Sequence, residues 1–559
     1  MTQAQNRFSA WLAQPSLEAG LKPELSAMAG NESAIEDAFG CALTFGTGGL
    51  RGVLGAGTNR INVHVVRRAA QAVADYVLTS SLPRCAAIGY DSRLCSERFA
   101  RETACVLAAN GITAHIYPRL EPVPALSFAV RVLSCGVGIC ITASHNPAQY
   151  NGFKVYGPDG CQLTPNGVAQ IASNLAARSY FDNIKSGNFD YLLAQNRIQW
   201  IPDAILDSYV DAVLSLRTGK NDLANLHLVY TPLNGSGLEC AQKLFQKLGV
   251  RHLRLVKEQA FPDGHFPTCP YPNPELPEAM ALGLSDCETL QPDLLIGTDP
   301  DCDRCGVAAP DKTGRFRLLT GNEVGVLLFD FICRRRLENG TMPEKPVCVT
   351  TIVSTDMAEP IARHYGVELR RTLTGFKYVG EQIGLLEREG CPERFLFGFE
   401  ESCGYLSGTH VRDKDGLNAV LLVCEAASWY QARGMTLADA VDALYEAYGF
   451  YACGLESFTF SGSDAMAQMT ARMRALRNHP PKAIAGSPVS GIVDYLSPET
   501  GLPSSDVLAF HLSSNAKLIV RPSGTEPKLK CYLSARSDTR AQADALLLAL
   551  KDACRSLLQ

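Results

Sequence analysis

The chain has 559 residues, a formal net charge of −5, 46% hydrophobic residues and 19% charged residues. One hydrophobic core rarely serves a chain of this length, so several domains are expected. The composition is that of an ordinary globular protein, and the small negative charge argues against a broad surface for nucleic acid or for anionic membranes. It leaves room for a local basic cleft that binds a phosphorylated substrate.

Twenty cysteines could suggest a disulfide framework, but such frameworks need an export signal and usually a small domain. The first eight residues, MTQAQNRF, lack the apolar region of a signal peptide, and no segment stays apolar over a membrane-spanning length. The cysteines stand singly among strand and helix residues, as small core hydrophobes do. We therefore expect a cytoplasmic protein with reduced thiols, and neither a membrane nor a nucleic acid as partner.

The segment FGTGGLRG at residues 45–52 looks at first like a dinucleotide-binding fingerprint. Its spacing fails, because Arg51 holds the place of the third glycine and no good strand precedes the segment. We interpret it as a flexible loop that brings Arg51 towards phosphate. Further on, Asn62 is predicted to cap a helix in which apolar residues at 66–77 recur at steps of three and four.

Three parts of the chain repeat one pattern, which predicts three similar α/β units. Each unit begins with a β-rich run that ends in a polar loop, at residues 85–93, 226–237 and 347–356. After a helical segment, second strands are predicted at residues 112–117, 250–256 and 367–373. Third strands then end at Ser144, Asp299 and Glu400. Such alternation predicts mainly parallel sheets, with ligands bound at the carboxyl ends of the strands.

The C-terminal part breaks this rhythm. A fully apolar helix is predicted at 416–424 and should pack between layers. Beyond it, strands are predicted at 458–460, 492–495 and 517–520, with an amphipathic closing helix at 541–558. We predict an α/β protein of three similar mixed sandwich domains plus a smaller α+β domain. The predicted domains are 1–205, 206–322, 323–450 and 451–559.

The loop TASHNP at residues 142–147 presents Ser144 at the end of a strand, and Lys154 follows ten residues later. This arrangement suits a serine that reacts with phosphate rather than with an acyl group. A serine hydrolase would need Gly-x-Ser-x-Gly, which is absent here. Because His145 is adjacent to Ser144, we do not expect its imidazole to reach that hydroxyl as a general base. The alternative interpretation is a plain Ser/Asn/Pro turn.

The loop DPDCDR at residues 299–304 places Asp299, Asp301 and Asp303 at alternate positions. In an extended loop these residues share one side, so their carboxylates can converge on one hard cation such as Mg²⁺. An EF-hand is excluded because Arg304 and Pro310 stand where its glycine and glutamate belong. A solvated acidic turn is the alternative, but three carboxylates this close repel one another, which favours a metal site.

The loop GFEESCG at residues 398–404 offers Glu400 and Ser402, whose oxygens suit the hydroxyls of a sugar. The alternative is an exposed acidic turn. Lys377, in TGFK at 374–377, is a further cation at the edge of the third unit, or else an ordinary solvated lysine.

The segment RPSGTEP at residues 521–527, with Lys530, has the groups that bind a dianionic phosphate. Arg521 supplies a guanidinium, Ser523 and Thr525 supply hydroxyls, and the backbone around Gly524 supplies amides. It is not a P-loop, because the Gly-Lys-Ser/Thr ending is missing. A plain turn is the alternative.

In this order, the loops at 142–147, 299–304, 398–402 and 521–525 resemble the four motifs of the α-D-phosphohexomutase superfamily, along nearly the whole chain. The resemblance implies four domains around a central cleft, with one motif from each. Within the superfamily, the loops are most similar to the branch of type-2 phosphoglucomutase and phosphopentomutase and to similar bacterial phosphoglucomutases. Cys302 departs from the small residue usual at its position and adds an oxidisable thiol.

The resemblance also implies a role for each residue. Ser144 would carry the phosphoryl group and, with three aspartates, would hold one Mg²⁺ per chain; Arg304 would steady that phosphate. The candidates for proton transfer and charge stabilisation are Lys154, His145 and Arg51. Of these, Lys154 is the first choice for the base. The metal ligands would be Ser144, Asp299, Asp301 and Asp303, and the substrate-binding residues Arg304, Lys377, Glu400, Ser402, Arg521, Ser523, Gly524 and Thr525.

The implied activity is that of a phosphoglucomutase, which interconverts glucose 1-phosphate and glucose 6-phosphate through phosphoserine and glucose 1,6-bisphosphate. Alternatives are activity on pentose or mannose phosphates, a glucose-1,6-bisphosphate synthase, and a catalytically silent binding protein. The intact serine and aspartates argue against the last. We expect a phosphorylated sugar as partner, a fourth domain that swings to close the site, and a monomer or weak homodimer.

Overall fold

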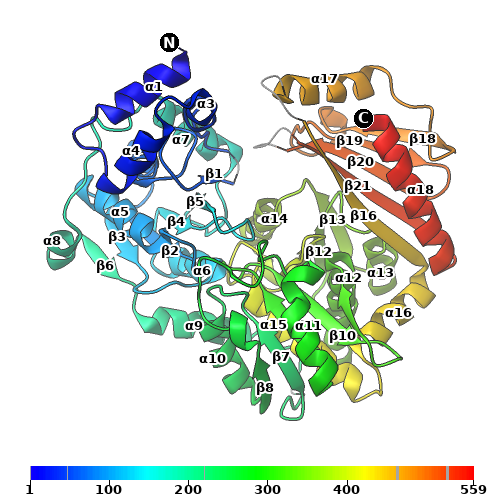
Figure 1. Cartoon of the computed structure of the whole chain (residues 1–559). Coiled ribbons are helices and arrows are strands. Elements are labelled where there is room, and N and C mark those ends of the chain that lie inside the picture. The colour runs from blue at the N-terminus through cyan, green and yellow to red at the C-terminus, as the bar shows by residue number, and fades with distance from the viewer. Residues whose placement is uncertain (1, 47, 220, 461–464, 524–527, 559) are drawn as a thin grey trace.

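The computed structural model describes residues 2–46, 48–219, 221–460, 465–523 and 528–558, which form four sheets with their covering helices (Figure 1). The predicted class is confirmed: three similar α/β units are followed by a C-terminal α+β unit. Every helix in the described ranges is too short or too polar to span a bilayer.

The three predicted repeats share one sheet topology. In each, the first strand pairs in parallel with the second and the third, and a fourth strand returns antiparallel to the third. In the first unit these strands are β2 (Cys85–Tyr90), β3 (Thr113–Ile116), β4 (Val137–Ile141) and β5 (Tyr150–Tyr156). In the second unit they are β7 (His227–Thr231), β8 (His252–Leu255), β9 (Leu294–Thr298) and β10 (Cys305–Pro310). In the third unit they are β12 (Val347–Thr351), β13 (Glu368–Thr372), β14 (Phe395–Glu400) and β15 (Gly404–Leu406). Strands β1 (Leu50–Val53), β6 (Ile198–Trp200) and β11 (Phe316–Leu319) extend the first two sheets. The loops after β4, β9 and β14 therefore lie at equivalent edges, as predicted.

Helices cover both faces of the first sheet. Alternate residues of a strand point to opposite faces, so Ala86 and Ile88 of β2 face one core while Ala87 faces another. The first core is formed with α4 (Val63–Thr79), α5 (Ser96–Ala109) and α7 (Pro165–Ala176), and the second with α6 (Val123–Val132) and α9 (Asp203–Leu214). Asn62 caps α4 as predicted, by accepting a hydrogen bond from the amide of Val65. A short helix, α8 (Phe189–Ala194), precedes β6.

The second of these cores continues through the second and third units, so the first three units share one core. At its centre lies α15 (Gly416–Gln431), the predicted apolar helix, which packs against neighbours from all three units. The other helices here are α10 (Leu238–Leu248), α11 (Pro277–Leu290), α12 (Gly321–Glu338), α13 (Ala358–Tyr365), α14 (Lys377–Arg388) and α16 (Leu437–Tyr448). A shared core of this size should hold the three units together as one body.

The C-terminal unit has a core of its own. Its antiparallel sheet comprises β16 (Phe450–Thr459), β17 (Ala483–Ile484), β18 (Ser487–Asp494), β19 (Leu508–Leu512), β20 (Ala516–Pro522) and β21 (Lys528–Ser537). Helices α17 (Ala465–Asn478) and α18 (Arg540–Leu558) pack on one face, which Figure 1 shows on the outer side of the sheet. The other face meets the third unit through a small apolar cluster that includes Ile352, Leu373 and Ile519. This unit is therefore attached far less extensively than the first three are to one another.

Three N-terminal helices, α1 (Gln3–Leu12), α2 (Lys22–Met28) and α3 (Glu32–Phe39), form a satellite core against α4. His64 of α4 lies in this contact, next to the rings of Trp11 and Phe181. Its Nε2 accepts a hydrogen bond from the backbone amide of Glu18 at 3.2 Å, which requires that this nitrogen carry no proton. Burial lowers the pKa of His64 to about 4.

This histidine predicts acid sensitivity. Because the pKa of His64 is lower in the folded chain than in the unfolded chain, the unfolded state binds the extra proton first, and stability falls as the pH drops from about 6.5 towards 4. Between pH 7 and pH 5 we expect His64 to account for a loss of about 1–2 kcal/mol in the free energy of unfolding. Urea unfolding at both pH values should show a smaller loss for His64→Gln. The exposed His265→Gln is the control, and equal losses in wild type and His64→Gln would contradict the prediction.

Candidate active site

The loop after β4 holds Ser144 in an unusual backbone conformation. Its φ is +52°, in the left-handed region that residues other than glycine rarely adopt. The Ser144 amide donates to Oγ1 of Thr142 at 2.8 Å, and the Ser144 hydroxyl donates to Oδ2 of Asp299 at 2.8 Å. The loops of the first and second units thus meet at this hydroxyl.

His145 corrects one expectation from the sequence. Its Nδ1 lies 3.1 Å from Oγ of Ser144, although adjacency was expected to keep the imidazole away. The left-handed backbone at Ser144 turns the serine side chain back over the following residue, which sequence spacing alone does not reveal. Burial lowers the pKa of His145 well below its usual value, and the nearby Arg304 and Arg51 lower it further.

Strand β5 carries Lys154 back to the same place. At Gly152 the strand passes so close to the serine loop that a Cβ would lie 2.5 Å from the carbonyl oxygen of Thr142, so only glycine fits. Lys154 Nζ then reaches Oδ2 of Asp301 at 2.9 Å and Oδ2 of Asp303 at 3.8 Å. Burial alone would lower the pKa of Lys154, but these two carboxylates outweigh it and raise the pKa.

The predicted acidic loop forms a compact cluster. One carboxylate oxygen from each of Asp299, Asp301 and Asp303 lies within 4.8 Å of the other two, and all three residues are buried. Oδ1 of Asp299 accepts hydrogen bonds from the amides of Asp303 and Arg304, which folds the loop around it. Burial and mutual repulsion raise the pKa values of Asp299 and Asp303.

These residues fit a hard divalent cation. Oδ1 of Asp301 and Oδ1 of Asp303 are buried and accept no hydrogen bond within the described residues. An unpaired buried carboxylate oxygen is costly, and Mg²⁺ binds to few carboxylates together with a phosphate oxygen. A phosphoryl group on the Ser144 hydroxyl, which lies beside Asp299, would bring a phosphate oxygen to the cluster.

Two charged residues that the sequence analysis did not single out complete the cluster. Glu275, from a proline-rich loop of the second unit, forms an ion pair with Nη1 of Arg304. Lys414 Nζ lies 3.1 Å from Oδ2 of Asp303 and 3.4 Å from Oδ1 of Asp413; although burial lowers its pKa, these carboxylates raise it overall. Lys414 could have been found in the sequence, because the charged run RDKD at 412–415 directly precedes the apolar helix. Glu275 gives no such signal.

One cavity of about 440 Å³ collects side chains from all four units. Its wall includes the loop after β14, where Oγ of Ser402 donates to Oε2 of Glu400 at 3.4 Å and burial raises the pKa of Glu400. The predicted residues in the wall are Arg51, Ser144, His145, Lys154, Asp303, Arg304, Glu400, Ser402 and Arg521, together with Lys530. Asp299 and Asp301 lie beneath the wall, fully buried.

Lys377 and Ser523 are not among the described residues that line this cavity. Lys377 lines a neighbouring cavity between the first and third units, with its ammonium 4.9 Å from the centre of the Tyr378 ring. Ser523 lies at the end of β20 and donates its amide to the carbonyl of Lys528. Gly524 and Thr525 lie outside the described residues.

Arg51 requires a second correction. It was expected on a flexible loop but lies in β1, paired with Gly152 of β5. From this edge strand, Nη1 of Arg51 donates a hydrogen bond to Oδ1 of Asn146 at 3.0 Å. The segment around Arg51 is too short and too glycine-rich for a strand to be predicted from the sequence. Strand β1 depends on its pairing with β5, which lies about a hundred residues further along the chain. Thr47, in the same segment, lies outside the described residues.

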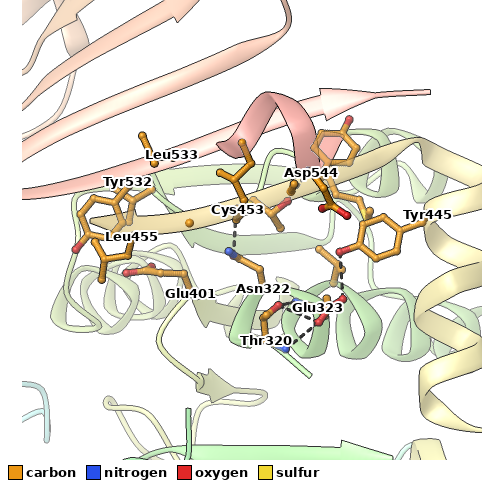
Figure 2. Close-up of a pocket in the computed structure, with 18 of the residues that line it drawn as sticks. Thr320, Asn322, Glu323, Glu401, Tyr445, Cys453, Leu455, Tyr532, Leu533 and Asp544 are labelled. Atoms are coloured by element: carbon orange, nitrogen blue, oxygen red, sulfur yellow. Dashed lines mark hydrogen bonds between the residues drawn. The ribbon is translucent and has the colours of Figure 1, made fainter. Parts of the chain in front are cut away.

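A second cavity, of about 310 Å³, lies between the third and C-terminal units (Figure 2). It shares Glu275, Glu401, Leu455 and Tyr532 with the active-site cavity. Figure 2 shows Leu455, Tyr532 and Glu401 at one end and Tyr445 with Glu323 at the other, where the tyrosine hydroxyl donates to Oε1 of the glutamate at 3.3 Å. Burial and the neighbouring carboxylates Glu400 and Glu275 raise the pKa of Glu401 to about 7.

Known protein families match this chain along most of its length. Domains I, II and III of phosphoglucomutase/phosphomannomutase, each described as alpha/beta/alpha, match residues 42–181, 207–314 and 320–448. The C-terminal domain of the same proteins matches residues 490–547.

Individual proteins with names from the same family are also similar to this chain over most of its length. A phosphoglucomutase of Staphylococcus aureus is 35% identical over 522 residues, which cover 90% of this chain and 92% of that protein. A Haemophilus influenzae protein named "Probable phosphomannomutase" is 35% identical over 509 residues, which cover 90% of this chain and 98% of that protein. In fold, the chain is similar to parafusin, a phosphoglucomutase of Paramecium, with a TM-score of 0.68, 18% identity, and coverage of 92% and 95% of the two chains.

Proposed function

Because this chain belongs to the phosphoglucomutase/phosphomannomutase family, within the α-D-phosphohexomutase superfamily, and so is a mutase-type isomerase, we propose that it interconverts glucose 1-phosphate and glucose 6-phosphate. The observation that carries the proposal is the position of Ser144. Its hydroxyl lies 2.8 Å from a cluster of three buried carboxylates, at the wall of a cavity to which four units contribute.

Phosphoryl transfer depends mostly on positioning and on stabilisation of charge. In the proposed reaction, phosphorylated Ser144 gives its phosphoryl group to the free hydroxyl of the sugar phosphate, which yields glucose 1,6-bisphosphate. The bisphosphate then reorients within the cavity, so that its other phosphoryl group faces Ser144 and is transferred back to it. Arg304 is placed to steady the phosphoryl group, because its Nε lies 4.0 Å from Asp299 and 3.9 Å from Asp303 beside the serine.

Asp299, Asp301 and Asp303 would hold the one Mg²⁺, which when bound supplies positive charge against the transferring phosphoryl group. Lys154, His145 and Arg51 all line the cavity beside Ser144 and remain the candidates for proton transfer and charge stabilisation. Glu400 would accept hydrogen bonds from the sugar hydroxyls, and Ser402 would donate hydrogen bonds to them or accept hydrogen bonds from them.

Arg521, together with Ser523 and with Gly524 and Thr525, which lie outside the described residues, would hold the phosphate that does not react. Lys530 lies in the same wall as Arg521. One such site must serve both orientations of the bisphosphate. We propose that the C-terminal unit swings to close over the substrate and exclude water. Two observations support this motion: the unit has a separate core, and Gly449, with φ +94°, joins α16 to β16.

The choice of sugar is the finer part of the proposal. One relative is named a phosphoglucomutase and another a phosphomannomutase, so mannose phosphates are the second candidate substrates. The hydroxyl pattern of the sugar is read by only a few groups, mainly Glu400 and Ser402, and a small change in their position would alter the preference.

A coupled assay tests the proposal. Wild-type protein with Mg²⁺, glucose 1-phosphate and a trace of glucose 1,6-bisphosphate should form glucose 6-phosphate. We expect kcat/KM for glucose 1-phosphate to exceed the values for the 1-phosphates of mannose, ribose and N-acetylglucosamine. A higher value for mannose 1-phosphate would favour the second candidate. Formation of neither a sugar 6-phosphate from the hexose substrates nor ribose 5-phosphate from ribose 1-phosphate, with fully folded protein, would refute mutase activity.

A further inference from the structure

Arg93, in the loop that follows β2, lies directly against the backbone of the serine loop. Its Nη1 donates to the carbonyl oxygens of Pro147 at 2.8 Å and Tyr150 at 3.1 Å. Its Nη2 donates to the carbonyl oxygens of Ser144 and Asn146. One guanidinium thus binds four carbonyls across seven residues, and its side chain is 0% exposed.

Arg93 is itself held from two sides. Oδ2 of Asp91 lies 3.4 Å from its Nε, and Oδ1 of Asp91 accepts its backbone amide at 3.0 Å. The ring of Phe266, which the second unit contributes, lies 5.0 Å from the guanidinium carbon. The side chain is therefore fixed between the unit that carries the serine and the unit that carries the aspartate cluster.

The serine loop needs such a contact. A left-handed backbone is strained in a residue other than glycine, so Ser144 keeps it only because its surroundings impose it. Thr142 fixes the amide of Ser144 and Arg93 fixes its carbonyl. If the carbonyl were released, the peptide could rotate, and Oγ would leave its position beside Asp299.

We propose that Arg93 is a positioning residue for phosphoryl transfer: it holds Ser144 in the left-handed conformation that aims its oxygen at the aspartate cluster. The inference rests on the proposed function, in which Ser144 carries the phosphoryl group. Arg93 is not expected to touch the substrate, since its side chain is buried and does not line the cavity, whereas Ser144 and His145 of the serine loop do. Its loss should therefore lower kcat and leave KM for the sugar phosphate nearly unchanged.

Arg93→Lys is the informative variant, because it keeps the positive charge but loses the planar fork that reaches four carbonyls. A displacement of about 1 Å in a reacting group can cost on the order of 10²-fold in rate. We expect kcat to fall by about 30- to 100-fold, with KM within about twofold of wild type. In Arg93→Ala, added guanidinium chloride should restore part of the lost kcat.

Arg68→Lys is the matched control. Arg68 is also buried, lies in the same unit, and donates to the carbonyls of Leu175 and Arg178, but it does not touch the serine loop. Both lysine variants should lose thermal stability, whereas only Arg93→Lys should lose kcat. Equal losses of kcat in the two variants would overturn the proposal.

Amide hydrogen exchange tests the same idea without the reaction. Peptides covering residues 142–150 should exchange faster in Arg93→Lys than in wild type or Arg68→Lys, while peptides from α4 should not differ between wild type and Arg93→Lys. Unchanged exchange in 142–150 would overturn the proposal. A wild-type protein without mutase activity would instead refute the proposed function, and the exchange result would still decide whether Arg93 holds the loop.

Discussion

Replacement of Ser144 by alanine is expected to abolish the mutase reaction. The hydroxyl that carries the phosphoryl group is lost, and the other hydroxyl of this loop, on Thr142, donates to Asp301 rather than to Asp299. In covalent enzymes, removal of the nucleophile lowers kcat by up to about 10⁶-fold, and we expect a loss of at least about 10⁴-fold here. The purified variant should also lack the mass of one phosphate, about 80 Da.

The Ser144→Ala variant should still fold, because its methyl group keeps the packing of the buried loop and the amide of residue 144 can still donate to Thr142. Its melting temperature should lie close to that of wild type. Ser402→Ala is the comparison: it removes a hydroxyl from the same cavity but should keep the phosphate mass. A phosphate that persists in Ser144→Ala would place the phosphorylated residue elsewhere in the chain.

Asp303→Asn is expected to have the second largest effect. It removes one of the three carboxylates yet leaves Lys414 with Asp413 as a partner, so no buried charge is stranded. Loss of one preorganised charge partner typically costs about 10²–10³-fold in rate, and we expect a loss of that size in kcat. Mn²⁺ titration followed by electron paramagnetic resonance should show affinity weakened by at least about tenfold.

Thermal unfolding adds an independent measurement. Mg²⁺ should raise the melting temperature of wild type, because a ligand that binds only the folded state stabilises it. Asp303→Asn should show a much smaller rise, and without metal it should be no less stable than wild type, since one repulsive charge has been removed. Asp311→Asn, at a partly exposed aspartate of the same unit, is the control. An equal rise with Mg²⁺ in wild type and Asp303→Asn would contradict the metal assignment.

Much of this arrangement follows from local sequence. The first strands of the three units are short, apolar and end in polar loops, so their repetition predicts three sheets with loops at equivalent edges. Ser144 and the three aspartates were predicted because each group stands at the end of the third strand of its unit. Asn62 was predicted as a helix cap for a reason equally local, since its side chain bonds to an amide three residues on.

The rest depends on contacts between distant segments. Arg51 lies in a strand only because β5 pairs with it, and His145 reaches Ser144 only because the backbone there is left-handed. Glu275 and Lys414 enter the site from loops of two different units, and each is recognisable only by its partner there. Side chains that act across units are set by tertiary packing, which spacing along the chain does not encode.

The most direct test follows one phosphoryl group. Protein labelled with ³²P is mixed with unlabelled glucose 1-phosphate and Mg²⁺ and quenched within milliseconds. If the residue at the end of β4 is the donor, the label should leave the peptide containing position 144 and appear in glucose bisphosphate and glucose 6-phosphate at the rate of turnover. Label that stays on that peptide while product accumulates would contradict the account.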